Sequence, residues 1–225
     1  ELLDTEAWGF GFVHRSQPGV MSITQTSEYG TAYAREELQA LADHAHELGL
    51  HVHVDGARLA NAAAALGCTL AEAANGADII SLGGTKNGGM LSEAVVVVNP
   101  DAARGVDFLR KTSMQLSSKM RFISAQLLAL FDGDLWHRNA MHANAMAQLL
   151  AERVGAIDGV TITQAVQANA VFAPLPADVT SRLQAEHRFY TWNEATGEVR
   201  WMCSWDTTAD DIETFAASVA AQMSG

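Results

Sequence analysis

Hydrophobic and polar residues alternate along the chain in a pattern that predicts an α/β fold for its first part. Between residues 20 and 98, short apolar runs typical of strands are separated by segments with helical spacing. The predicted strands are 20–24, 50–55, 78–82 and 94–98, and the predicted helices are 35–48, 59–66 and 70–75. Strands and helices that alternate at this length predict a mainly parallel sheet with helices on both faces.

The remainder of the chain is richer in helix. Helices are predicted over 101–110, 120–131, 135–154, 177–186 and 210–223, and strands over 160–164, 170–174, 188–193 and 199–204. Thr208 is a suitable amino-terminal cap for the last helix. We expect the long helix near residue 140 to connect a large domain, residues 1–139, to a small α+β domain, residues 140–225. Residues 1–19 are mixed in character.

Composition narrows the range of partners and compartments. Of the 225 residues, 48% are hydrophobic, which is enough for a sizeable core. The net charge of −12 makes nucleic acid and anionic membranes poor partners. No apolar run reaches the roughly 20 residues that a membrane helix needs, and no secretory signal is visible. Cys68 and Cys203 fit unpaired roles in a reducing compartment better than a disulfide, so we expect a soluble, cytoplasmic protein.

Candidate chemistry is concentrated where two predicted strands end. Lys86 lies between two apolar runs, in ISLGGTKNGG, with a pair of glycines on each side. Such a lysine either extends into solvent or acts as an amine nucleophile, because desolvation favours its neutral form. Asp55 ends the strand 50–55, at the sheet edge where open α/β sheets bind ligands. Pyridoxal phosphate uses both groups, a lysine for its aldehyde and a carboxylate for its protonated ring nitrogen.

Five sequence blocks, in this order along the chain, resemble the threonine aldolase / β-eliminating lyase family. They are SITQTSEYGTAY (22–33), HVDGARLANAA (53–63), DIISLGGTKNG (78–88), KMRFISA (119–125) and VRWMCSWD (199–206). The resemblance is greatest to the low-specificity L-threonine aldolase branch. It implies the aspartate-aminotransferase-like fold, fold type I of pyridoxal-phosphate enzymes. It also implies a further amino-terminal segment that carries the phosphate loop and the residue that stacks on the cofactor ring.

The resemblance implies roles for four residues in these blocks. Lys86 is expected to be the catalytic lysine that binds the cofactor covalently, and Asp55 the partner of its ring nitrogen. Arg58 is expected beside the phenolic oxygen of the cofactor and the carboxylate of the substrate. Arg200 lies in an otherwise apolar strand and is the better candidate to bind that carboxylate, because guanidinium matches it with two hydrogen bonds.

Other residues of the same blocks have weaker assignments. The resemblance implies that Arg121, in the block with Lys119, lies near the cofactor phosphate, although a solvated helix face explains this pair equally well. Glu28 and Tyr29 belong to a turn that borders the active site in the family. For either residue alone, a surface loop is the better interpretation. The family more often has Thr-His where this chain has Cys203-Ser204, a difference that bears on the substrate pocket.

The expected function is that of a lyase that cleaves the Cα–Cβ bond of a β-hydroxy-α-amino acid, as in conversion of threonine to glycine and acetaldehyde. Within this cofactor class, β-elimination or another aldol substrate such as phenylserine is the alternative. A metal-dependent hydrolase that uses His51, His53 and Asp55 is another, because alternate strand residues share a face, but it explains neither Lys86 nor Arg200. A further alternative is that this chain is inactive by itself. The resemblance implies a homodimer or homotetramer.

Overall fold

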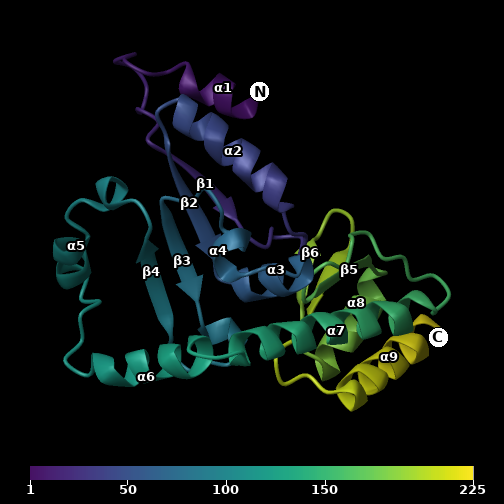
Figure 1. Ribbon diagram of the computed structural model, residues 1–225. Helices are drawn as coiled ribbons and strands as arrows, with labels where there is room; N and C mark the ends of the chain where they lie inside the picture. Colours follow the sequence, from purple (N-terminus) through teal and green to yellow (C-terminus); the bar gives the residue numbers. More distant parts are fainter. Residues whose placement is uncertain (225) are drawn as a thin grey trace.

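The computed structural model describes residues 1–224 and contains two separate β-sheets (Figure 1). The first sheet consists of β1 (Val20–Thr24), β2 (His51–Gly56), β3 (Ile79–Gly83) and β4 (Glu93–Val97), in this order. The first three strands are parallel, and β4 runs antiparallel to β3. The mainly parallel sheet of an α/β fold, expected from the hydrophobic pattern, is therefore confirmed.

Three helices that connect the parallel strands pack against one face of this sheet. They are α2 (Arg35–Glu47), α3 (Leu59–Leu66) and α4 (Leu70–Ala73). Val52 is buried against residues of α2, and Val54 against residues of α3 and α4. These two alternate residues of β2 are almost completely inaccessible to solvent. A strand with one face buried contributes every second side chain to the core in this way.

The opposite face of the first sheet carries polar side chains. His53 and Asp55 of β2 point to this face, and both are only partly buried. Ser22 of β1 is in register with His53, and Ser81 of β3 is in register with Asp55. The alternation of the strands thus separates a helix-covered apolar face from a polar face that ends at Asp55.

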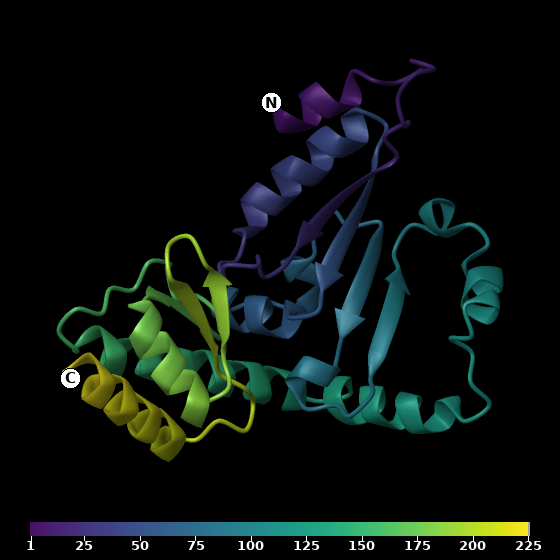
Figure 2. The ribbon, with the colours of Figure 1, turned by 180° about the vertical axis from the view of Figure 1, so that it is seen from behind.

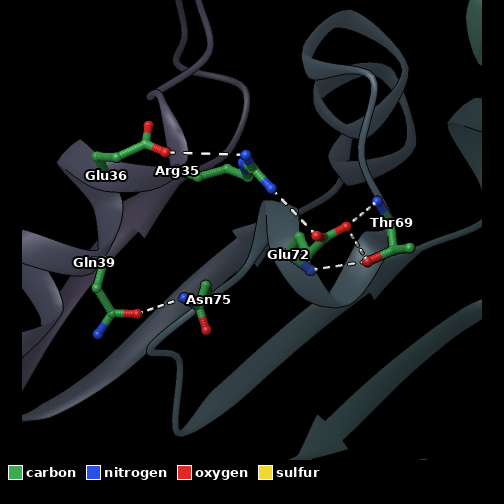
Figure 3. A network of polar contacts seen from close by, with 6 residues as sticks. All are labelled: Arg35, Glu36, Gln39, Thr69, Glu72 and Asn75. Atoms are coloured by element: carbon green, nitrogen blue, oxygen red, sulfur yellow. Dashed lines mark hydrogen bonds and ion pairs between the residues drawn. The ribbon is translucent and has the colours of Figure 1, made fainter.

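Polar contacts also tie α2 to the segment around α4 (Figure 3). Arg35 Nη1 lies 3.2 Å from Glu72 Oε1, and Asn75 donates a hydrogen bond to the side chain of Gln39. Glu72 and Thr69 form a capping box, in which Thr69 Oγ1 accepts from the Glu72 amide and Glu72 Oε2 accepts from the Thr69 amide. Exposed pairs of this kind stabilise by at most about 1 kcal/mol each, so their main effect is to orient α4.

The second sheet is antiparallel and has the order β5-β7-β6. Its strands are β5 (Ala170–Pro174), β6 (Tyr190–Asn193) and β7 (Glu198–Met202), and it packs with α7 (Leu135–Gly155), α8 (Ala177–Glu186) and α9 (Ala209–Met223). One hydrophobic core joins these elements, and it includes Val154, Val171, Leu183, Val199 and Val219. The cap predicted for the last helix is confirmed, because Thr208 Oγ1 accepts a hydrogen bond from the Asp211 amide.

The long helix α7 contacts both parts of the molecule. In Figures 1 and 2 it continues the direction of α6 (Met120–Phe131), passes α3, and then runs beneath the second sheet. Asn144 of α7 is buried and exchanges two hydrogen bonds with Asn61 of α3, at 2.9 and 3.0 Å. Because α7 is continuous through residue 140, the proposed division into domains at residues 139 and 140 stays a prediction.

One predicted helix is wrong in its extent. Instead of a single helix over 101–110, the structure has a 3-10 helix, η2 (Pro100–Ala103), and then α5 (Val106–Thr112). Gly105 between them adopts φ +77°, a left-handed conformation that interrupts the first segment and that glycine accepts at little cost. At the amino terminus, where no element was predicted, the structure has the short helix α1 (Leu2–Ala7).

The strand predicted over 160–164 is absent from both sheets of the described residues. Thr163 donates a single backbone hydrogen bond to Phe172 of β5, at 3.0 Å, and the chain then turns away. Val160 and Ile162 alternate with polar residues because they pack against the core of the second sheet. The apolar alternation over 160–164 therefore comes from a loop that packs into the core, and the predicted strand is wrong.

Candidate active site

The carboxylate of Asp55 lies at the carboxyl end of β2, on the polar face of the first sheet. One of its oxygens, Oδ1, accepts a hydrogen bond from the backbone amide of Ala57 at 3.0 Å, which orients the side chain. Within residues 1–224 the other oxygen, Oδ2, accepts no hydrogen bond. The geometry therefore leaves one carboxylate oxygen available to a donor outside the described residues.

The turn that contains Asp55 touches the turn that leads to Lys86. A Cβ atom added to Gly83, at the end of β3, would lie 2.8 Å from Ala57 Cα and 2.9 Å from Ala57 O. Only glycine permits so close an approach between two backbones. The DGAR and GGTK motifs, which the sequence separates by a helical segment and a strand, are therefore packed directly against each other at one edge of the sheet.

Lys86 lies in a 3-10 helix, η1 (Thr85–Asn87), that follows β3. The side-chain amide of the neighbouring Asn87 is buried and donates to the Trp136 carbonyl at 3.0 Å, while Asn139 donates to the Asn87 carbonyl at 2.8 Å. Both partners belong to α7, which therefore holds the turn in place. The side chain of Lys86 itself is exposed, and its ammonium group forms no ion pair within the described part of the chain.

Arg58 is the last residue of the DGAR motif and directly precedes α3, and it is close to several charged groups. Burial lowers the pKa of its guanidinium, and the positive charge of Arg200 lowers it further, while Glu28 and Asp55 partly offset both effects. Four charged residues from β2, β7, the turn after β1 and the start of α3 thus converge here. The positive charge of Arg200 acts on Arg58, so an additional anion here would be favourable to both guanidinium groups.

Arg200 projects from β7, where it is in register with Phe172 of β5. Its side chain is 16% exposed, and Nη1 lies 3.8 Å from Glu28 Oε2. The guanidinium carbon is 4.4 Å from the centre of the Trp192 ring. Nε is buried and has no hydrogen-bond partner within residues 1–224. An unpaired buried donor of a charged group is costly, and a ligand carboxylate would reach this guanidinium through its other N–H donors.

The sequence interpretation missed Trp192 and underestimated Glu28. Glu28 is on the surface, with its side chain 61% exposed, but its carboxylate faces Arg200. Trp192 is in β6, in an irregular part of the pairing with β7 between Thr191 and Asn193. Neither residue carries a local pattern that indicates contact with Arg200, because each approaches it from a different element.

Arg121 and Lys119 lie apart from this charged cluster. Arg121 is in the first turn of α6 and Lys119 directly precedes that helix; both side chains are exposed. Within residues 1–224 neither side chain forms a hydrogen bond or an ion pair. The expectation that Arg121 contacts the cofactor phosphate stays a prediction.

The two histidines of β2 have different partners, which argues against the metal site considered above. His53 Nδ1 lies 2.8 Å from Ser22 Oγ and its Nε2 lies 2.9 Å from Ser81 Oγ. His51 Nδ1 lies 3.6 Å from the carboxylate of Asp78 instead. Among residues 1–224 there is no group of three or more histidine, cysteine, aspartate or glutamate residues suited to a metal ion.

Cys203, at a position where the sequence differs from the family pattern, is buried in the core of the second sheet. Burial raises the pKa of its thiol to about 12, so the thiolate is not formed near neutral pH. The cysteine therefore contributes packing and takes no part as a nucleophile.

Comparison with solved structures first defines the class of protein. The fold is that of the fold type I pyridoxal-phosphate enzymes. A PLP-dependent aminotransferase from Streptococcus suis covers the whole chain with a TM-score of 0.71 at 15% identity, where 61% of that protein is matched. A threonine aldolase of Leishmania major has a TM-score of 0.88 and 27% identity, covering 97% of this chain and 65% of its own.

The sequence comparison then identifies the family. The model of the beta-eliminating lyase family matches residues 7–176, and the chain belongs to this family. A low specificity L-threonine aldolase of Pseudomonas aeruginosa is 42% identical over 214 residues, which are 94% of this chain and 62% of that protein. The chain thus spans about three-fifths of the length of the curated relatives it matches. The family resemblance stated from the sequence blocks is confirmed.

Proposed function

We propose that the whole protein is a pyridoxal-phosphate-dependent aldolase that converts threonine to glycine and acetaldehyde by cleaving the Cα–Cβ bond. The observation that carries the proposal is the direct packing of the DGAR turn, with Asp55, against the GGTK turn, with Lys86. The charged cluster that includes Arg58 and Arg200 lies beside the first of these turns. The 42% identity to a low specificity L-threonine aldolase supports the same reaction.

The residues of this edge of the sheet fit pyridoxal phosphate. Lys86 offers a solvent-accessible primary amine, and Asp55 offers a carboxylate oxygen without a partner in the described residues. When bound, the cofactor supplies an electron sink for the bond that breaks at the α carbon.

Each side chain of the cluster then has a distinct task. Lys86 provides the amine that holds the cofactor, and Asp55 accepts the N–H of the protonated ring. Arg200, assisted by Arg58, binds the carboxylate of the substrate and so fixes which bond of the α carbon is in position to break. Cleavage also requires a base that removes the β-hydroxyl proton, and the O–H electrons then become the carbonyl bond of the aldehyde.

Replacement of Lys86 tests the proposal directly. The whole protein should show the visible absorption band of a lysine-bound cofactor, and the band should be reducible by borohydride. Lys86→Ala should remove the band and abolish cleavage of threonine. Arg188→Ala, at an exposed position between α8 and β6, is the control and should retain both. An unchanged, reducible band in Lys86→Ala would contradict the assignment.

β-Elimination is the second candidate, because the family that contains the chain is named for that reaction. It would release a group from the β carbon and leave the Cα–Cβ bond intact. Incubation with threonine, phenylserine and serine, followed by identification of the products, distinguishes the two. Glycine together with an aldehyde indicates the aldolase, whereas a keto acid and ammonia indicate elimination.

Three further assignments complete the proposal. Arg121 contacts the cofactor phosphate, so Arg121→Ala should raise the cofactor concentration needed for half-maximal activity.

The protein is a homodimer or homotetramer. Exposed apolar side chains such as Phe108 (80%) and Phe122 (63%) support a subunit interface on α5 and α6, and sedimentation measures the oligomeric state. It acts in the cytoplasm, which two free cysteines support. No helix among residues 1–224 is long and apolar enough to cross a membrane.

A further inference from the structure

The guanidinium of Arg200 lies on the face of an aromatic ring that is itself well supported. The guanidinium carbon is 4.4 Å from the centre of the Trp192 ring. Phe172 and Tyr29 contact that ring edge-on, with centroid separations of 5.6 and 5.9 Å and interplanar angles of 78° and 74°. Phe172 is completely buried, so the aromatic cluster is anchored in the second sheet. Trp192 therefore presents a fixed surface to Arg200.

Stacking of this kind uses the face of the guanidinium and leaves its edges free. All the N–H donors of arginine lie in the guanidinium plane, so contact with the ring consumes none of them. Glu28 approaches one corner, at Nη1, to 3.8 Å. Nε, on another edge, is buried and unpartnered within the described residues. Because Nε is covered, a carboxylate in the two-bond geometry that arginine favours would bind along the in-plane edge formed by the two Nη groups.

We propose that Trp192 is a positioning residue that fixes the plane of Arg200, so that this edge meets the carboxylate of the amino-acid substrate. The inference rests on the proposed function, in which Arg200 binds that carboxylate. Without the ring, the guanidinium can rotate about its long side chain, and part of the binding energy is then used to order it. Trp192 touches neither the reacting bond nor the cofactor in this role.

The test compares Trp192→Leu and Trp192→Phe in the whole, cofactor-loaded protein. A cation–π contact at a partly desolvated site corresponds to a change of about fivefold to thirtyfold in binding. Trp192→Leu should raise KM for threonine by this factor and leave kcat within about twofold, whereas Trp192→Phe should restore most of the affinity. Trp8→Leu is the matched control, because Arg15 stacks on Trp8 at 4.5 Å outside the charged cluster, and it should leave KM unchanged.

Two further measurements separate positioning from general structural damage. Threoninamide lacks the carboxylate, so its KM should be the same in Trp192→Leu and in the wild-type protein. In spectra of protein labelled with ¹⁵N-arginine, the Nε–H signal that Arg200→Lys removes should be displaced in Trp192→Leu by loss of the ring current. An unchanged KM for threonine, or an equal rise for threoninamide, would overturn the proposal.

Arg200→Lys distinguishes a failure of this inference from a failure of the proposed function. A strong rise in KM for threonine in Arg200→Lys, with no effect of Trp192→Leu, refutes the role of Trp192 alone. An unchanged KM in Arg200→Lys refutes carboxylate binding by Arg200 and the role of Trp192 with it. If KM for threonine rises in Arg200→Lys and also in Trp192→Leu, while KM for threoninamide does not change, the roles of Arg200 and Trp192 are both supported.

Discussion

Glu28 Oε2 lies 3.8 Å from Arg200 Nη1, so a carboxylate of the protein itself faces the guanidinium proposed to bind the carboxylate of the substrate. The Glu28 side chain is 61% exposed and reaches this position from the turn after β1. At this separation the two groups attract each other without a hydrogen bond. A substrate carboxylate bound to Arg200 would lie near the Glu28 carboxylate and would be repelled by its negative charge.

Glu28→Gln should therefore strengthen substrate binding. Glu28 is exposed although Arg200 is not, and a pair with one partner in solvent is worth about 1 kcal/mol, so we expect KM for threonine to fall by up to about fivefold. The fall should become smaller at high salt, because salt screens the repulsion. Glu36→Gln, which removes a similar exposed carboxylate 3.9 Å from Arg35, is the control. A KM that rises in Glu28→Gln would show that the carboxylate assists binding.

Gly84→Ala should destabilise the turn that carries Lys86. The added Cβ would lie 2.6 Å from the Ser92 carbonyl oxygen and 3.1 Å from Leu130 Cδ1, and backbone cannot move aside as a flexible side chain can. Overpacking of this kind costs about 1–3 kcal/mol. Urea unfolding measures the loss, and Gly133→Ala, where a Cβ meets open space, should be close to neutral. Equal stability of the two variants would contradict the contact.

Asn144→Ala should weaken the connection between α7 and α3. It removes two buried hydrogen bonds and leaves the side-chain amide of Asn61 without its partner on α7. A buried polar group without a partner costs about 1–3 kcal/mol, so the free energy of unfolding should fall by that order. Gln148→Ala, at an exposed position of the same helix, should change it by less than about 0.5 kcal/mol. Thermal or urea denaturation provides the comparison.

Asp78 should contribute a pH-dependent part of the stability. Burial alone would raise the pKa of its carboxyl, but hydrogen bonds from Asn99, the Val52 amide and His46 outweigh burial and lower the pKa. A carboxyl with a lowered pKa stabilises the folded state above its unfolded pKa, and this contribution is lost as pH falls through the folded value. The prediction concerns the region below about pH 4.

Asp78→Asn isolates this contribution. The amide keeps one oxygen acceptor and places an NH2 group at the other position, where it faces either the Asn99 amide or the Val52 N–H. At pH 7 the variant should therefore be less stable by about 1–3 kcal/mol. The difference between wild type and variant should shrink as the pH is lowered below about 4. Unfolding curves recorded across this range measure it. A difference that does not change with pH would mean that the charge of Asp78 contributes nothing.

Much of the fold was predictable because its signals are local. Alternation in β2 separated Val52 and Val54 from His53 and Asp55, and the structure places the two sets on opposite faces. The helices α3 and α8 have the predicted bounds, 59–66 and 177–186. The predictions failed at residues 101–110 and 160–164. At the first a glycine conformation interrupts the helix, and at the second a loop packs into a core, and periodicity detects neither event.

The sequence by itself determined the fold class, the family, and Asp55, Lys86 and Arg200 as candidate site residues, because short motifs and strand periodicity depend on neighbouring positions. Only the tertiary structure decided that Glu28 and Trp192 meet Arg200, and that His51 and His53 serve different partners. These contacts join elements far apart in the chain, and their geometry depends on how two sheets and α7 pack together. A pattern of residue types along one segment contains no information about such distances.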